Sequence, residues 1–253
     1  KVVLKNLLSP PIRDVDCLVM EGTMLGRDDQ EYEDEDAVEA RMTEIFGSKE
    51  NIAFAFCSSQ NIDRLVSIYK AAKRARQTLV IDLYTAYILD SLKGLSDKLP
   101  QYWWNDIKVM YFQHHAEVLA NNELKNFLYG CKSDKIEKEE INRDKKNIVM
   151  LAKYSYDFRR FLGHLDNLDG AVAIYSMWEG YLERSNLREI LDRKGIKFEC
   201  VHTSGHATEA DLKGLAGAFR PKYLVPIHTF HSQEYASLFR NVHMLNDGEE
   251  LVL

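Results

Sequence analysis

The chain has 253 residues, 45% of them hydrophobic, so it can bury one large core or two modest ones. Its formal net charge of −6 excludes a generally basic surface of the kind that binds nucleic acid over a whole protein, so any RNA contact must come from local basic patches. No apolar run approaches the roughly 20 residues of a membrane-spanning helix, and no membrane partner is expected.

The four cysteines are Cys17, Cys57, Cys131 and Cys200, which are far apart and lack the paired spacing of a zinc site. Three of them, at positions 17, 57 and 200, lie in apolar runs typical of strands, where cysteine acts as a small hydrophobic residue. This usage is typical of a reducing compartment and predicts a cytoplasmic protein.

The first predicted strand runs through the apolar segment 17–20 and ends at Glu21, just before Gly22-Thr23. Residues 28–36 then hold seven acidic side chains. They precede a predicted helix with Val38 and Met42 on its apolar side. Acidic groups at a helix start complement the helix dipole, so this run has a structural explanation.

From residue 51 onward, strand patterns alternate with helix patterns. The predicted strands span residues 51–56, 78–83, 107–112, 147–152, 171–175 and 197–201. The predicted helices between them begin near residues 62, 84, 115, 158 and 182. This alternation indicates βαβ units and a parallel sheet, interrupted by a charged surface excursion at residues 132–146.

Two histidines follow the last predicted strands of this pattern. His206 lies in Ser204-Gly205-His206, and His228 ends Val225-Pro226-Ile227-His228. Between them a predicted amphipathic helix starts at the capping pair Thr208 and Asp211. Strands joined by such a helix place both imidazoles at one sheet edge, where open α/β sheets bind ligands and metals. The chain then closes with a predicted hairpin, strands 242–245 and 250–253 around Asn246-Asp247-Gly248.

Two other loops carry candidate substrate contacts. Ser58 and Ser59 follow the strand that ends at Phe56, and they either cap the next helix or face a phosphate at its N-terminus. Trp178 follows a later strand and either stacks on a base or closes a domain interface. A basic cluster on the helix after residue 62 is either a solvated face or an RNA contact; its members are Arg64, Lys70, Lys73, Arg74 and Arg76.

Three ordered motifs in this chain resemble the β-CASP metallo-β-lactamase hydrolases, the family of ribonuclease J and of the endonuclease that cleaves mRNA precursors. They are Glu21 with Gly22-Thr23, Ser204-Gly205-His206, and Pro226-Ile227-His228. The resemblance implies an α/β fold in which a parallel-sheet β-CASP domain is inserted into the C-terminal part of an αββα metallo-β-lactamase fold. The implied domains are a metallo-β-lactamase segment at 1–27, a β-CASP domain at 28–196 and a metallo-β-lactamase C-terminal segment at 197–253.

The same resemblance implies a zinc-dependent hydrolase that cleaves RNA phosphodiester bonds with metal-activated water. It makes His206 the general acid, Glu21 the carboxylate that orients it, and His228 a ligand of one of two zinc ions. These roles suit the chemistry, because neutral imidazole binds zinc and histidine titrates near neutrality. In relatives, loops comparable to that of Ser58 and Ser59 contact the nucleic-acid backbone, and we expect Ser58, Ser59, Trp178 and Ser204 to contact the substrate.

The family's main metal-binding motif, His-x-His-x-Asp-His, is absent from this sequence. We therefore expect the chain to be the C-terminal part of a longer enzyme, whose missing N-terminal half supplies the other ligands, and we expect the chain alone to be inactive. The alternatives are a metallo-hydrolase for a non-nucleic-acid substrate and a non-catalytic scaffold fragment. A homo-oligomer is compatible with the sequence, which leaves the oligomeric state open.

Overall fold

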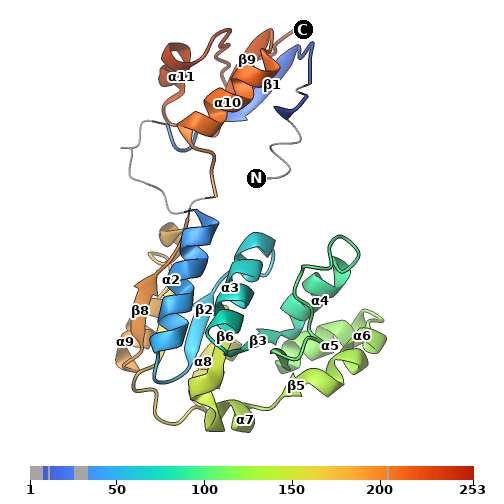
Figure 1. The fold of residues 1–253 in the computed structure, drawn as a ribbon, viewed down its shortest axis with the longest axis vertical. Helices are drawn as coiled ribbons and strands as arrows, with labels where there is room; N and C mark the ends of the chain where they lie inside the picture. Colours follow the sequence, from blue (N-terminus) through green and yellow to red (C-terminus); the bar gives the residue numbers. More distant parts are fainter. Residues whose placement is uncertain (1–7, 11, 26–33, 204) are drawn as a thin grey trace. The chain divides into compact units, whose positions relative to one another are not determined.

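The computed structural model describes residues 8–10, 12–25, 34–203 and 205–253, and these form two compact units (Figure 1). Unit 1 combines two separate stretches, residues 1–32 and 204–253, whereas unit 2 is the continuous stretch 33–203. The polypeptide therefore leaves unit 1 once and returns to it once. Across the described ranges, every helix is too short or too polar to cross a membrane.

Unit 2 is built on a seven-stranded, fully parallel sheet with the strand order β5-β4-β3-β6-β2-β7-β8. The strands are β2 (Ala53–Phe56), β3 (Thr78–Asp82), β4 (Ile107–Met110), β5 (Lys135–Ile136), β6 (Ile148–Ala152), β7 (Val172–Tyr175) and β8 (Lys197–Cys200). Every residue of β2, β6 and β7 is buried. Continuous burial is expected for parallel strands that are covered by helices on both faces.

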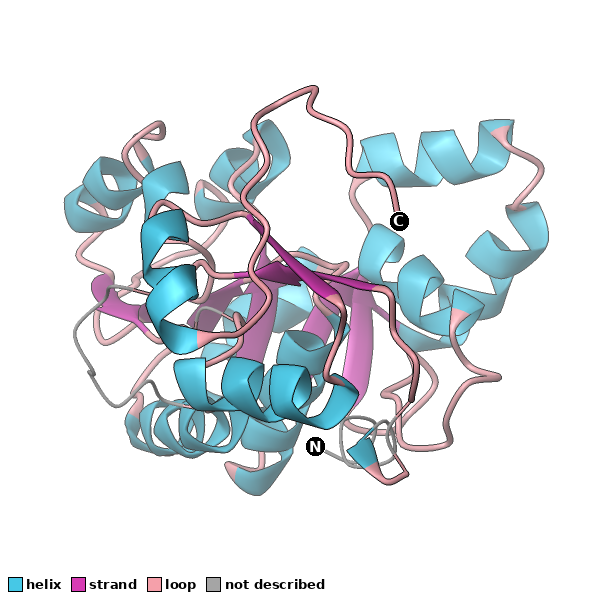
Figure 2. Ribbon diagram, turned by 90° about the horizontal axis from the view of Figure 1, so that it is seen from above, coloured by secondary structure: helices cyan, strands magenta, loops and turns pink. Residues whose placement is uncertain are grey.

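Helices cover both faces of this sheet (Figure 2). One face packs against α2 (Glu35–Ser48), α3 (Ile62–Arg74), α4 (Leu83–Ser91), α5 (Gln113–Asn121) and, at its margin, α6 (Lys125–Gly130). The other packs against α7 (Lys138–Arg143), α8 (Tyr156–Leu162) and α9 (Leu187–Arg193). Short 3-10 turns lie at η1 (Cys131–Asp134), η2 (Lys145–Asn147) and η3 (Glu179–Tyr181). Alternate residues of β2 show the division, since Ala53 and Ala55 join the first core and Phe54 and Phe56 the second.

Polar caps stop the strands and start the helices at the carboxyl edge of this sheet. Asp82 ends β3 and accepts a hydrogen bond from the amide of Thr85 at 2.7 Å, which begins α4. Asn61 caps α3 through the amide of Arg64 at 3.1 Å, and Ser155 caps α8 through that of Phe158. Each cap satisfies an amide that the first helical turn leaves unpaired, so polar side chains collect along this edge.

Unit 1 contains the parallel pair β1 (Cys17–Glu21) and β9 (Tyr223–Ile227) with α10 (Glu209–Phe219) and α11 (Ser232–Leu238). A small core of Met20, Leu25, Leu212, Leu224 and Tyr235 holds these elements together. The capping pair predicted for α10 is confirmed: the Thr208 side chain accepts from the Asp211 amide, and Asp211 reaches back to Thr208.

The predicted hairpin at the C-terminus is wrong. Val242 makes an isolated parallel bridge with Leu224, and the amide of Glu249 closes a turn on the carbonyl of Asn246 at 3.0 Å. Residues 250–253 form no strand, and Val252 and Leu253 are 85% and 70% exposed, so they have no packing partners that would hold a strand there. The turn residues thus dictate the bend, but they do not supply a second strand.

The two units divide at residues 33 and 204, whereas the expected boundaries lie at 28 and 197. The later C-terminal division follows from β8 (Lys197–Cys200), which pairs with β7 and so belongs to the sheet of unit 2. The sequence-based prediction of an α/β fold with a parallel sheet is confirmed. Its identification with a β-CASP insertion remains a prediction.

Candidate functional site

Glu21 is the last residue of β1 and stands level with Ile227 on β9. The hydroxyl of Tyr235 holds this strand end by donating to the carbonyls of Met20 and Glu21. Gly22 follows, and a Cβ atom there would lie 2.6 Å from the Tyr235 ring and 3.1 Å from Cβ of Thr229. Only glycine therefore lets the chain turn at this point with the loop after β9 so near.

The carboxylate of Glu21 contacts the segment that carries His206. Its Oε2 lies 3.2 Å from Nδ1 of His206, and its Oε1 accepts the amide of Ala207 at 3.0 Å. The amide of Thr23 donates to Oε2, also at 3.0 Å. One carboxylate thus holds together the ends of two segments that are far apart in the sequence.

Burial by itself would raise the pKa of Glu21, but hydrogen bonds from Thr23 and Ala207 and the nearby His206 outweigh it and lower that pKa. Glu21 is therefore ionised at neutral pH and can only accept hydrogen bonds. An acceptor at 3.2 Å requires a proton on Nδ1 of His206. The contact fixes the orientation and the tautomer of the ring. A carboxylate on one ring nitrogen is a common partner of histidines whose other nitrogen binds a metal or transfers a proton.

His228 follows β9 directly and is exposed. Its φ of 50° is in the left-handed region, which non-glycine residues seldom adopt and which is enriched at functional sites. Its carbonyl accepts the hydroxyl of Thr23 at 3.1 Å. The loops after β1 and β9 are therefore joined by hydrogen bonding, and the residues Glu21, His206 and His228 all lie at the carboxyl edge of unit 1.

A zinc ion needs about four ligands, and a catalytic zinc site takes three of them from the protein. Within residues 8–10, 12–25, 34–203 and 205–253, no group of three His, Cys, Asp or Glu side chains is placed to hold a metal. At the edge of unit 1, Glu21 already accepts from Thr23, His206 and Ala207, which leaves the imidazole of His228 as a candidate ligand. The described residues do not, by themselves, fit a complete zinc site.

The serines predicted to contact substrate differ in their surroundings. Ser59 is buried and its hydroxyl lies 2.6 Å from that of Thr85, which in turn donates to Asp82. Ser58 is exposed and its Oγ accepts the amide of Gln60. Asn61, rather than either serine, caps α3. Ser204 lies outside the described residues.

A cavity of about 580 Å³ opens at the carboxyl edge of the sheet in unit 2. Its floor lies between the loop after β2, which leads to α3 on one face, and the loop after β6, which leads to α8 on the other. Open α/β sheets bind ligands at such a change of direction. The polar and aromatic lining includes Ser58, Tyr84, His115, Lys153, Tyr154 and Tyr181.

Charges inside this cavity are balanced. Nζ of Lys153 lies 2.8 Å from Oδ2 of Asp82 and 4.6 Å from the centre of the Tyr84 ring. Nδ1 of His115 is buried without a hydrogen bond from the described residues, 3.9 Å from the same Asp82 oxygen. Burial lowers the pKa of His115 although Asp82 opposes it, so this ring is neutral at neutral pH. Sequence reasoning missed Lys153, whose signal is a lysine directly after a buried strand.

Trp178 follows β7 and is 58% exposed. Its ring meets that of Tyr181 edge to face at 5.2 Å, and it covers Gly180 so closely that a Cβ there would lie 2.3 Å from it. Both rings are exposed, and Tyr181 is one of the residues that line the cavity.

The basic cluster on α3 does not form a free cationic face. Lys70 and Arg74 both pair with Glu39, and Lys73 lies 3.4 Å from Asp106. Arg64 is 1% exposed and faces the interior. Its neighbours on the helix already indicate this, because helical spacing places it in line with Ser67 and Ile68, both buried.

Comparison with known proteins gives two findings. Residues 195–244, which include His206 and His228, match the family model described as the Zn-dependent metallo-hydrolase RNA specificity domain. The match is confined to this C-terminal segment and leaves the rest of the chain unmatched by that model. A crystal structure of a protein of unknown function from Enterococcus faecalis V583 is similar with a TM-score of 0.67 and 18% identity, over 100% of this chain and 54% of that one.

At this identity the likeness to the Enterococcus faecalis protein shows the fold alone. The present chain spans about half the length of that protein, since the alignment covers 54% of it. No curated protein matches the chain.

Proposed function

We propose that this chain forms part of a β-CASP ribonuclease, with unit 2 as the β-CASP domain and unit 1 as metallo-β-lactamase segments. The observation that carries the proposal is the 3.2 Å contact between Glu21 and His206. It joins a strand end from one terminus of the chain to a histidine inside the segment that matches the RNA specificity model. A merely structural histidine in this segment would not require a carboxylate held by three donors.

In this proposal His206 acts as the general acid. The carboxylate of Glu21 holds the proton on Nδ1, and the ring gives the proton on Nε2 to the oxygen that leaves the cleaved phosphodiester. A positioned acid of this kind typically accelerates a reaction 10² to 10⁴-fold. His228 offers one imidazole toward the two expected zinc ions, and the other ligands would have to come from outside the described residues.

The proposal assigns the cavity of unit 2 to the RNA strand. Exposed rings of Tyr84, Trp178 and Tyr181 supply surfaces on which bases stack, a contact worth about 1–3 kcal/mol per base. Ser58 and Lys153 line the same cavity, with the charge of Lys153 paired to Asp82. Ser59 supports this loop through Thr85 instead of reaching the strand itself.

All four cysteines lie in the described residues and carry free thiols, two of them fully buried. Free thiols persist in a reducing compartment, which supports the cytoplasm as the location in this proposal.

The test is an RNA cleavage assay on the complete protein with His206→Ala beside the wild type. Loss of the general acid should lower kcat by about 10² to 10⁴-fold. The matched control is His164→Ala, which removes an exposed imidazole from unit 2 that lies 3.5 Å from Lys138. Equal cleavage by wild type and His206→Ala would contradict the proposal, as would an absence of RNA cleavage by the wild type in the presence of zinc.

A further inference from the structure

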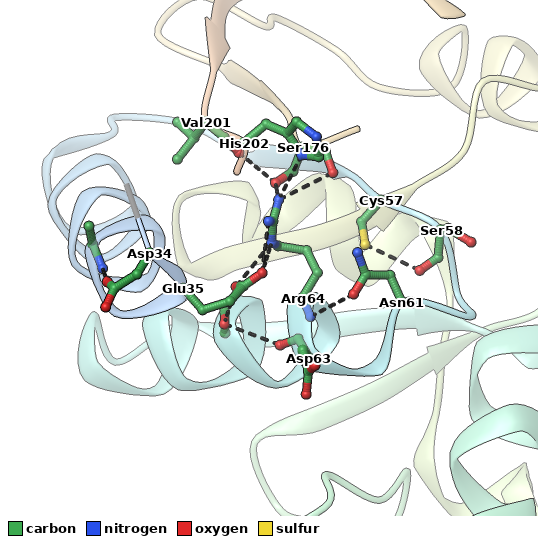
Figure 3. A network of polar contacts seen from close by, with 12 residues as sticks. Asp34, Glu35, Cys57, Ser58, Asn61, Asp63, Arg64, Ser176, Val201 and His202 are labelled. Atoms are coloured by element: carbon green, nitrogen blue, oxygen red, sulfur yellow. Dashed lines mark hydrogen bonds and ion pairs between the residues drawn. The ribbon is translucent and has the colours of Figure 1, made fainter. Parts of the chain in front are cut away.

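Arg64 is a fully buried arginine, 1% exposed, near the start of α3. Its guanidinium donates in three directions (Figure 3). It meets the carboxylate of Glu35 in a fork, with Nε at 3.1 and 3.2 Å and a terminal nitrogen at 2.8 Å. Its other terminal nitrogen bonds the hydroxyl and carbonyl of Ser176 and lies 3.2 Å from Nδ1 of His202. All of these partners lie within unit 2.

These partners come from the two ends of unit 2. Glu35 opens α2, two positions after the unit begins at residue 33, and His202 stands one position before it ends at residue 203. Ser176 reinforces the second end, since its hydroxyl donates to the carbonyl of Val201 at 2.5 Å. The hydroxyl of Ser67 supports the first end by donating to Glu35 at 2.8 Å. Both polypeptide connections to unit 1 thus adjoin one buried cation.

We propose that Arg64 is a positioning residue that clasps the first and last residues of unit 2, so that the connections leading to Glu21 and His206 leave unit 2 at fixed points. The proposal rests on the proposed function only for its effect on catalysis. That effect is expected because His206, the proposed general acid, comes three residues after Thr203, the last residue of unit 2. The clasp itself is a property of unit 2. A domain inserted into another must bring its own ends together, and here the Arg64 side chain contacts both of them.

The clasp requires a neutral His202. A guanidinium can only donate hydrogen bonds, so Nδ1 of His202 must accept and its proton must sit on Nε2. Protonation of His202 at Nδ1 would place its N–H against the N–H of Arg64, and it would put a second positive charge beside the guanidinium. Burial first and Arg64 second lower the pKa of His202, while Glu35, the Ser176 carbonyl and Glu179 raise it. The charged groups that face the ring are thus Arg64 on α3, Glu35 on α2 and Glu179 after β7.

Hydrogen exchange on the complete protein tests the clasp at pH 7.5 and pH 5.5, with protection corrected for the intrinsic rate at each pH. Wild-type protection of residues 200–203 should fall about tenfold on acidification, as expected when a local hydrogen bond is lost. The variant His202→Asn should keep its protection at both values, since its amide oxygen takes the place of Nδ1 without titrating. The same pH dependence in both proteins would overturn the proposal.

A second comparison uses Arg64→Lys, which keeps the charge but loses the fork, beside Arg74→Lys on the exposed side of the same helix. Protection of residues 200–203 should drop about tenfold for the first and stay unchanged for the second. Equal protection in the two variants would overturn the clasp. If Arg64→Lys fails to fold, the wild type and His202→Asn still decide.

Cleavage kinetics separate this proposal from the proposed function. Arg64→Lys should lower kcat of RNA cleavage about tenfold with little change in KM, because it loosens the end of unit 2 from which the chain leads to His206 and does not touch substrate. If the wild type cleaves no RNA, the proposed function fails while the exchange results still decide the clasp. If the wild type cleaves RNA and Arg64→Lys cleaves it equally well, the positioning role fails.

Discussion

His202 and His206 lie four positions apart, yet their surroundings are opposite. Nδ1 of His206 faces the carboxylate of Glu21 at 3.2 Å and so carries a proton, and its side chain is 42% exposed. Nδ1 of His202 faces the guanidinium of Arg64 at 3.2 Å and so carries none, in a half-buried setting. The charge of the neighbouring group decides whether an imidazole can hand on a proton or only accept a hydrogen bond. In our proposals, the same residue type serves chemistry in unit 1 and architecture in unit 2.

The largest effect should be the loss of stability caused by Arg64→Met, which removes the guanidinium that contacts His202. Removing the cation takes the Arg64 donor from Glu35, Ser176 and His202; breaking a fully buried pair costs about 3–5 kcal/mol, and the loss should be smaller here because the Glu35 side chain is 36% exposed. Arg193→Met is the control, since Arg193 is 65% exposed in its ion pair with Glu189, itself 66% exposed, and such pairs contribute about 1 kcal/mol or less. Urea unfolding of the two variants measures the difference, and equal midpoints would contradict a buried clasp.

The exposed side of the comparison is tested by Glu21→Gln. An amide in this position no longer fixes the proton on Nδ1 of His206, so kcat of RNA cleavage should fall about 10 to 100-fold with the fold intact. Glu234→Gln makes a matched control, because Glu234 pairs with the exposed His231 at 2.9 Å in the same unit. If both variants lose activity equally, the pairing of Glu21 with His206 has no special role.

A smaller effect should appear in the pH dependence of stability. The pKa of His202 is lowered by burial and by Arg64, whereas in the unfolded chain this residue titrates near 6.5. The unfolded chain therefore binds its proton first, so the contribution to stability is complete above about pH 6.5 and is lost as the pH falls through the folded pKa. Urea midpoints at pH 7.5 and 5.5 should converge for wild type and His202→Asn at the higher value and separate at the lower one.

The smallest effect expected is zinc binding by these 253 residues alone. With no group of three ligands among the described residues, the chain should retain less than one zinc ion per molecule after desalting. Metal analysis by mass spectrometry makes this measurement, with His228→Ala as the comparison. Tight, stoichiometric binding of two zinc ions would contradict this prediction.

Much of the fold could be predicted because local pattern and global structure agree. The apolar runs ending at Phe56, Ala152 and Tyr175 are buried on both faces, so their continuous hydrophobicity is a direct signal of parallel strands. The meeting of Glu21 with His206 follows from a strand pairing that places Glu21 opposite Ile227. The order of the strands could not be predicted in this way, because the insertion of β6 between β3 and β2 depends on contacts between distant segments.

The clasp at Arg64 escaped prediction for a similar reason. A charged residue among Lys70, Lys73 and Arg74 suggests a solvated face, and only its alignment with Ser67 and Ile68 on the helix indicates burial. Its partners Glu35 and His202 are separated from it by long stretches of chain, so no local window contains them together. Side-chain networks that join three segments are visible only once the segments have been brought together.

The pairing of β1 with β9 has a consequence for biosynthesis. Because residues 17–21 pair with residues 223–227, this strand pair cannot form on the ribosome until β9 has emerged, about 200 residues after β1. At about 5–20 residues per second, that delay is roughly 10 to 40 seconds. Unit 2, which is continuous in sequence, can fold during this interval, before β9 pairs with β1. Premature termination before residue 223 would leave a folded insert attached to an apolar, aggregation-prone tail.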